Sequence, residues 1–329
     1  MKIILSYYKY NLRMKVLKFG GTSVANAQNI KLVINIVSKK AIDEKLIVVV
    51  SAFSKVTDML QIASKKAAAG DESFKEILAE IEKKHLDALK ELIPVSEQSS
   101  LLSHIKRIVN HLETLLDGCY LLGELSLRTA DTILSFGELL SSYIIAEALK
   151  QNLKNSGYKD SRELIKTNKH FGKAAVNFEI TNSLIVEYFG SNENQVVVMP
   201  GFIAASQDGI NTTLGRGGSD YSAAIIAGAL NATELEIWTD VNGMFTANPK
   251  VVKQAQPIAF ISYQEAMELS HFGAKVLYPP TIQPVLRKNI PILIKNTFDP
   301  ETDGTYISNQ ELTHTNPVKG ISHIDNITL

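Results

Sequence analysis

The run Leu46–Val50 (LIVVV) constrains the fold more than any other segment, because all five of its residues are apolar. A strand that is apolar on both faces must be buried on both faces, which is typical of a parallel sheet covered by helices. The preceding segment, Asn26–Lys40, places Ile30, Val33 and Val37 at helical spacing. The two segments together predict an amphipathic helix that leads into a buried parallel strand.

A strand and a glycine turn come before this helix. Lys15–Phe19 has the composition of a short strand, and Gly20–Ser23 (GGTS) follows it, so the region reads as a βαβ unit. Adjacent glycines let the backbone approach a bulky group, and free amides at a helix N-terminus favour phosphate. The turn is a candidate phosphate cradle with Lys18 at its edge, and an ordinary strand-to-helix turn is the alternative. A Walker A loop is excluded because its pattern is missing from the chain.

Residues 58–127 are rich in Lys, Glu and Leu and predict a helical insertion of two or three helices. Ser73 and Glu76 match a capping box, and Pro94 is expected to end a helix. The α/β rhythm then returns. Strands are expected at 195–199, 235–239, 291–294 and 304–307, and helices at 131–150, 219–230 and 262–272. The fold class is therefore α/β with a mostly parallel central sheet.

Composition excludes several function classes. Lys plus Arg and Asp plus Glu both number 34, and this balance argues against a nucleic-acid partner. No apolar run approaches the ~20 residues of a membrane span, so no membrane partner is expected. One cysteine, Cys119, excludes an internal disulfide framework and suits a cytoplasmic protein. The seven histidines show no paired metal spacing, so no metal site made by the protein itself is predicted.

The segment 212–220 (TTLGRGGSD) leads into a helix and resembles a dinucleotide fingerprint only in part. Asp220 stands where a third glycine is needed, and no strand is expected directly before the segment, so a Rossmann site is rejected. Arg216 can bind a carboxylate with two hydrogen bonds. A helix cap is the simpler role for Asp220, although it leaves the glycines unexplained.

Other charged positions carry less information on their own. The turn-rich segment 238–250 follows a strand, at the sheet edge where open α/β folds bind ligands, but a surface loop is the commoner explanation. Lys275 in FGAK is by itself a surface lysine. Glu124, Asp131 and Glu138 are expected to be surface charges on helices when taken alone.

Five motifs taken together resemble the catalytic domain of aspartate kinase, a branch of the amino-acid kinase family. In order they are KFGGTS (18–23), SFGE (135–138), TTLGRGGSDYSAA (212–224), WTDVNGMFTANPK (238–250) and SYQEAMELSHFGAKVLYP (262–279). The resemblance implies a three-layer α/β/α sandwich. It also implies an amino-acid-binding lobe at about 14–203 and a nucleotide-binding lobe at about 204–308.

The resemblance also assigns roles to residues. Catalytic roles fall on Lys18, Asp220 and Lys275. Substrate contacts fall on Ser51, Thr57, Glu138, Phe202, Arg216 and Ser219, with Glu138 on the α-amino group and Arg216 on the α-carboxylate. Nucleotide contacts fall on Lys18, Gly20, Gly21, Thr22, Ser23, Thr239, Asp240, Phe245, Lys250 and Lys275. The chain departs from the family pattern at Phe245, where tyrosine is common, and at Asn248-Pro249-Lys250, where Asp-Pro-Arg is common.

The implied activity is ATP-dependent phosphorylation of the aspartate β-carboxylate, the first step toward lysine, threonine, methionine and isoleucine. ATP and Mg²⁺ are the expected cofactors, L-aspartate and MgATP the expected partners, and the full-length protein is expected to be a homo-oligomer. A related kinase for glutamate, acetylglutamate or a nucleotide, and a non-catalytic aspartate- and nucleotide-binding module, are alternatives. A nicotinamide oxidoreductase is disfavoured by the missing fingerprint.

The chain ends suggest a larger parent protein. Residues 1–13 are interpreted as an N-terminal extension and 14–308 as the kinase domain. Residues 309–329 are interpreted as a linker and the start of a truncated ACT regulatory domain, because VKGISHIDNITL resembles the first ACT strand. The stretch 121–138 (LLGELSLRTADTILSFGE) resembles the kinase form that is fused to homoserine dehydrogenase.

Overall fold

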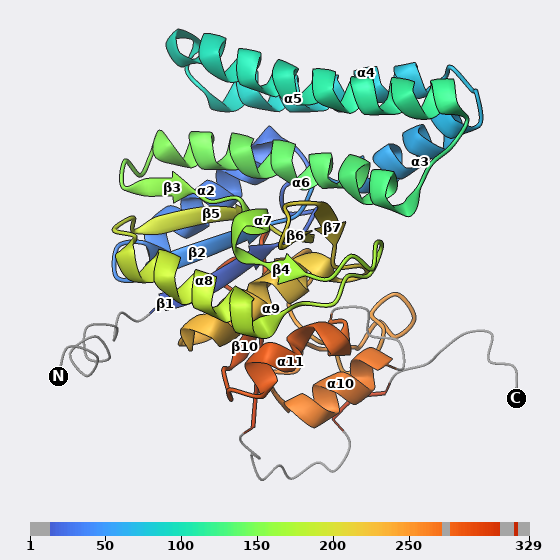
Figure 1. Ribbon diagram of the computed structural model, residues 1–329. Coiled ribbons are helices and arrows are strands. Elements are labelled where there is room, and N and C mark those ends of the chain that lie inside the picture. The colour runs from blue at the N-terminus through green and yellow to red at the C-terminus, as the bar shows by residue number, and fades with distance from the viewer. Residues whose placement is uncertain (1–13, 272–276, 310–318, 322–329) are drawn as a thin grey trace, which may run out of the picture.

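The computed structural model describes residues 14–271, 277–309 and 319–321 of the 329-residue chain. Their centre is an eight-stranded sheet in the order β3-β5-β2-β1-β8-β10-β11-β9 (Figure 1). All neighbours in this sheet are parallel except β10 and β11. Its strands are β1 (Met14–Phe19), β2 (Lys45–Val50), β3 (Ser156–Tyr158), β5 (Val196–Pro200), β8 (Glu234–Thr239), β9 (Phe260–Ser262), β10 (Ile292–Asn296) and β11 (Thr305–Ser308). A three-stranded sheet joins β4 (Lys166–Thr167), β6 (Ile203–Ser206) and β7 (Asn211–Thr213).

Helices cover both faces of the large sheet (Figure 1). Those of the first half are α2 (Ala27–Lys40), α3 (Val56–Ala68), α4 (Phe74–Leu92), α5 (Val95–Leu122) and α6 (Leu127–Lys150). Those of the second half are α7 (Ser161–Leu164), α8 (Phe178–Ser191), α9 (Gly218–Leu230), α10 (Tyr263–His271), the 3-10 helix η2 (Pro279–Ile282) and α11 (Gln283–Leu286).

Strand β2 shows why the molecule has three layers. Leu46, Val48 and Val50 lie in one hydrophobic core with α2 and α6. Ile47 and Val49 lie in a second core with α8 and α9. All five side chains are fully buried, because successive residues of a strand point to opposite faces of the sheet. The predicted α/β/α sandwich and its mostly parallel sheet are therefore confirmed.

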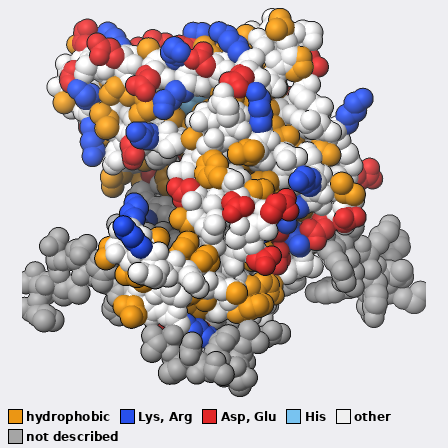
Figure 2. Space-filling model, turned by 180° about the vertical axis from the view of Figure 1, so that it is seen from behind, with side chains coloured by type: hydrophobic (Ala, Val, Ile, Leu, Met, Phe, Trp, Pro, Cys, Tyr) orange, Lys and Arg blue, Asp and Glu red, His pale blue; other side chains and the backbone are white. Residues whose placement is uncertain are grey.

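The helical insertion is formed by α3, α4 and α5, which pack on one another and on α6. Figure 1 shows α4 and α5 as an outer layer beyond α6. Acidic and basic side chains are interspersed on this layer over the face shown in Figure 2. The helices and the break at Pro94 were predicted correctly, but the capping box was not. Ser73 makes no cap hydrogen bond, and its hydroxyl accepts a hydrogen bond from Lys66 instead.

Helix α6 is the core helix of the domain. It is the one described helix long and apolar enough to suit a membrane, yet 72% of that stretch is buried inside the protein. It packs against β2, β3, β5 and the insertion. The interpretation of Asp131 and Glu138 as surface charges is wrong, because Asp131 is 1% and Glu138 3% exposed.

Between residues 156 and 213 only β5 was predicted, and the 14-residue helix α8 and the shorter elements were not. Strands β3, β4 and β7 have only three, two and three residues, too few to show a two-residue period. Strand β7 directly precedes the glycine loop, so the expectation that no strand comes before it is wrong. Its sequence, Asn-Thr-Thr, has no apolar residue, and it is ordered by antiparallel pairing with β6.

Candidate active site

A cavity of about 560 Å³ lies where β1, β2 and β8 end and where α3 and α9 begin. Ligand sites of open α/β sheets occur at this carboxyl edge. The lining residues are Lys18, Gly20, Gly21, Thr22, Ser51, Ala52, Phe53, Ser54, Lys55, Thr57, Asp58, Glu138, Phe202, Gly215, Gly217, Gly218, Ser219, Asp220, Thr239 and Asp240. The predicted cradle and the predicted glycine loop therefore share one cavity.

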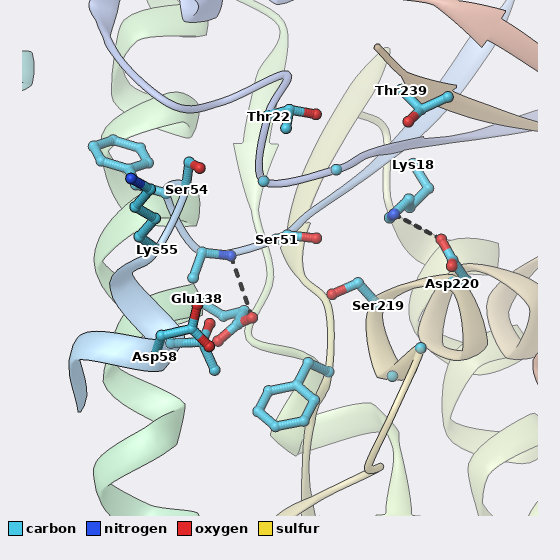
Figure 3. A pocket seen from close by; sticks show the side chains of 18 of the residues that line it. Lys18, Thr22, Ser51, Ser54, Lys55, Asp58, Glu138, Ser219, Asp220 and Thr239 are labelled. Carbon is cyan, nitrogen blue, oxygen red and sulfur yellow. Dashed lines mark hydrogen bonds and ion pairs between the residues drawn. The ribbon is translucent and has the colours of Figure 1, made fainter. Parts of the chain in front are cut away.

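An ion pair joins these two motifs. Lys18 lies near the end of β1 and Asp220 in the first turn of α9, and their Nζ and Oδ1 atoms are 2.7 Å apart. The two side chains are only 12% and 14% exposed and point toward each other in Figure 3. An acidic side chain is favoured at a helix N-terminus by the helix dipole. The pair therefore presents an ammonium group to the cavity at a defined position.

The glycine turn after β1 passes very close to its neighbours. A Cβ atom at Gly21 would lie 3.2 Å from the Ala52 carbonyl oxygen, and one at Gly20 would lie 3.5 Å from Lys18 Nζ. Ser23 lies behind the turn, where its buried hydroxyl is 2.7 Å from that of Thr297. Its side chain ties the turn to the strand layer and does not line the cavity.

Glu138 is a buried acid with one free oxygen. Its Oε1 accepts a hydrogen bond from the Ala52 amide at 3.2 Å, while its buried Oε2 has no partner (Figure 3). Burial raises the pKa of this carboxyl to about 8, because desolvation disfavours the charged form. A buried, unpartnered carboxylate oxygen that lines a cavity is suited to bind a cationic ligand group.

The glycine loop before α9 packs directly against Phe202. A Cβ atom at Gly218 would lie 2.6 Å from the Phe202 ring, and Gly217 has a φ of 70°. Phe202 itself has a φ of 63°, in the left-handed region that costs a bulky residue about 1–3 kcal/mol. Such strain is found at binding sites, where the surrounding packing maintains it.

Asp131 supports this loop from α6. Its carboxylate accepts hydrogen bonds from the Thr213 amide at 2.9 Å, the Thr213 hydroxyl at 2.8 Å and the Gly172 amide at 3.0 Å. Asp131 and Glu138 are seven residues apart, about two helical turns, so they lie on the same side of α6. That spacing is the signal in the sequence that could have identified the two acids as a pair on one face of α6.

The structure brings twelve of the predicted residues together around the cavity. They are Lys18, Gly20, Gly21, Thr22, Ser51, Thr57, Glu138, Phe202, Ser219, Asp220, Thr239 and Asp240.

Four others do not line it: Ser23, Arg216, Phe245 and Lys250. Arg216 is exposed, and its guanidinium lies 5.4 Å from the centre of the Tyr278 ring. Lys275 lies outside the described residues. Ser54, Lys55 and Asp58 also line the cavity and were not predicted, although they lie beside the predicted Ser51 and Thr57.

No group of three or more His, Cys, Asp or Glu side chains within the described residues could hold a metal ion.

Known proteins resemble this chain in sequence and in fold. The model of the amino acid kinase family matches residues 13–296. The chain belongs to the amino acid kinase family. This family member is 37% identical over 318 residues to the bifunctional aspartokinase/homoserine dehydrogenase 2 of Arabidopsis thaliana. That match covers 95% of this chain but 35% of the relative, so the chain spans about a third of that protein's length. It is also 38% identical to the aspartokinase of Chlamydia pneumoniae over 89% of this chain and 62% of the relative.

Solved structures show the same fold. The structure of E. coli aspartokinase III in complex with aspartate and ADP has a TM-score of 0.82 and 33% identity, covering 91% of this chain and 65% of that one. UMP kinase from Bacillus anthracis has a TM-score of 0.52 at 13% identity, a likeness of fold alone. The amino acid kinase fold of this chain is therefore established.

Proposed function

We propose that this chain is an aspartate kinase, which transfers the γ-phosphoryl group of ATP to the β-carboxylate of L-aspartate. The observation that carries the proposal is the cavity itself. It combines the Lys18–Asp220 pair and a glycine turn with a buried, unpartnered Glu138 oxygen. The cation and the backbone amides suit a phosphate group, and the buried acid suits an amino group held near it. The similarity to aspartokinases, including one solved with aspartate and ADP, supports this choice.

The amino acid would bind around Glu138. Its α-ammonium would pair with the free Oε2, which would lower the pKa of Glu138 and keep the carboxylate ionised. Ser51, Thr57, Phe202 and Ser219 would complete this end of the cavity. Arg216 would bind the α-carboxylate only if its guanidinium left Tyr278.

The nucleotide would bind at the other end. Lys18, Gly20, Gly21 and Thr22 would surround the phosphates, with Thr239 and Asp240 beside them. Ser23, Phe245, Lys250 and Lys275 remain proposed nucleotide contacts, with Ser23 acting from behind the turn and the exposed Lys250 contributing only weakly. Mg²⁺ would arrive with ATP and neutralise phosphate charge, and Asp220 and Asp240 are the cavity carboxylates able to hold it.

The chemistry requires no general base. The β-carboxylate of aspartate is ionised at neutral pH, since its reference pKa is about 3.9. A carboxylate oxygen forms a bond to the γ-phosphorus, the bond from that phosphorus to the β–γ bridging oxygen breaks, and ADP departs. Catalysis then rests on positioning two anions and neutralising their charge, which Lys18 and the turn amides provide.

Further parts of the proposal concern the larger protein. The lobes are proposed to meet at about residue 203, and the full-length protein is proposed to be a cytoplasmic homo-oligomer. The single cysteine of this chain, Cys119, is buried and free, which suits a reducing compartment.

The test is aspartate-dependent release of ADP by this chain, with hydroxylamine present to trap the acyl phosphate. Glutamate, acetylglutamate and UMP serve as alternative acceptors. We expect release and trapping with aspartate only. Release with another acceptor alone would overturn the proposal, and so would nucleotide binding without any turnover.

A further inference from the structure

The charges that line the cavity do not match the substrates of the proposed reaction. Even with Glu138 protonated, as its pKa of about 8 implies, two cations, Lys18 and Lys55, face three carboxylates, Asp58, Asp220 and Asp240. An acidic cavity repels aspartate and ATP, which are both anions. The Lys18–Asp220 pair cancels one charge of each sign. Among the described residues that line the cavity, Lys55 is then the one cation that forms no ion pair.

The backbone at Lys55 is in a conformation that favours glycine. It has a φ of 68° and a ψ of −7°, in the left-handed region, at the N-cap of α3. A lysine pays about 1 kcal/mol or more for this conformation, whereas a glycine adopts it freely. The Lys55 side chain makes no capping hydrogen bond, so helix capping does not explain why a lysine stands at this position. An outlier of this kind at a cavity indicates a role for the side chain in binding.

The segment that carries Lys55 is rigid although the side chain itself is exposed. Phe53, two residues earlier, is 2% exposed and stacks on the buried His85 with ring centres 4.7 Å apart. Val56, the next residue, is fully buried, and its amide donates to the Phe53 carbonyl at 2.9 Å. The core therefore determines where this backbone lies, and the lysine stem extends from a fixed point.

Figure 3 shows at which end of the cavity Lys55 lies. Lys55, Asp58 and Glu138 are drawn on one side of Ser51, and the Lys18–Asp220 pair is drawn on the other. The end near Glu138 has an acid for the ammonium of an amino acid. The guanidinium of Arg216 lies over Tyr278 and does not line this end. Lys55 is the cavity-lining cation available there for a carboxylate.

We propose that Lys55 is a substrate-binding residue that pairs with a carboxylate of the incoming dicarboxylic amino acid. This proposal rests on the proposed function. An aspartate carries two carboxylates and one ammonium. Glu138 can pair with the ammonium, but neither Glu138 nor Asp58 can neutralise a carboxylate, so a cation is needed at that end of the cavity. Because the amine of Lys55 is exposed, its attraction is screened by salt, with a Debye length of about 8 Å at physiological ionic strength.

The main test compares Lys55→Gly with Lys55→Arg. Glycine removes the charge and relieves the backbone, so lost folding cannot explain an effect. We expect the KM for aspartate to rise about five- to tenfold, the size of one charged hydrogen bond at a partly exposed site, with kcat changed less than about twofold. The KM for ATP should be unchanged, and arginine should restore the KM for aspartate to within about threefold of wild type.

Two controls isolate the charge and the backbone. Lys65→Gly removes an exposed lysine from the same helix outside the cavity, and Asn231→Gly relieves another left-handed residue, at the end of α9. Neither should raise the KM for aspartate. In addition, the difference between wild type and Lys55→Gly should shrink as KCl is raised.

The outcomes separate the two proposals. A wild-type chain that releases no ADP with aspartate refutes the proposed function. If the wild type is active and Lys55→Gly leaves its KM for aspartate unchanged, only the role of Lys55 is refuted. A rise confined to the KM for ATP would also overturn it, because the amine would then serve the nucleotide.

Discussion

The surroundings of Glu138 and the segment 239–250 both lie at the carboxyl edge of the sheet, but they are built differently. At Glu138 the carboxylate is 3% exposed and bonded to Ala52, and the nearby Ser51 carbonyl accepts a hydrogen bond from Ser141 at 2.8 Å. After β8, by contrast, Asp240 and Lys250 are exposed, and Lys250 lies outside the cavity lining.

This difference has an energetic consequence. A charge or polar group buried among fixed neighbours loses much when one partner is removed, because the remaining group stays desolvated. An exposed loop side chain exchanges protein contacts for water at little net cost. Substitutions should therefore have larger effects near Lys18, Asp131 and Glu138 than at Lys250.

Lys18→Ala should have the largest effect. It removes the ammonium group that pairs with Asp220 and would face the transferred phosphoryl. Turnover should fall by at least about 10² to 10³, as for loss of one preorganised donor. A coupled ADP-release assay measures this, with Lys39→Ala, an exposed lysine of α2, as the control. Near-normal turnover would remove Lys18 from the catalytic machinery.

Asp131→Ala should have the next largest effect, and this effect is on the stability of the fold. It leaves the amides of Thr213 and Gly172 and one hydroxyl without their acceptor, at an expected cost of about 3 kcal/mol in the free energy of unfolding. Urea unfolding measures this cost. Glu113→Ala, on the exposed face of α5, should cost less than about 0.5 kcal/mol. Equal losses of stability in the two variants would show that the hydrogen bonds of the buried Asp131 carboxylate do not stabilise the fold.

Glu138 should make stability depend on pH. Its pKa is raised from 4.5 to about 8 by burial, so the native state holds a proton that the unfolded state releases. The contribution of this bound proton to the free energy of unfolding is fully present below pH 4.5 and is lost as pH rises toward 8. Relative to Glu138→Gln, the wild-type free energy of unfolding should fall by at least about 2 kcal/mol between pH 5 and pH 8. Parallel pH curves for the two proteins would contradict the buried state of this acid.

Lys250→Ala should have the smallest effect. Because Lys250 is exposed and outside the cavity lining, the KM for ATP should change by less than about threefold. A tenfold or larger rise would show that segment 239–250 closes on the nucleotide. It would remove the contrast between the two regions.

The elements that were predicted are long enough to show a pattern, although the 14-residue helix α8 was missed. The helix expected at 26–40 is α2, and the strand expected at 46–50 is β2, each within one residue of its observed bounds. Strand β7 could not be predicted because Asn-Thr-Thr shows no apolar alternation, and its order depends on pairing with β6. The motifs, with Ser51 and Thr57, identified the segments that form the cavity, but Lys55 was missed because a single lysine in a loop shows no pattern.

What the sequence alone determined is which segments are buried, since apolar patterning is a local property, as the continuous apolar run Leu46–Val50 shows. What only the tertiary structure decided is the state of each polar group. Asp131 and Glu138 are both acids on α6, yet Asp131 is saturated by amides of distant segments while Glu138 keeps a free oxygen. The reason is physical: hydrogen-bond partners and desolvation come from residues far away in the chain, and no local pattern encodes them.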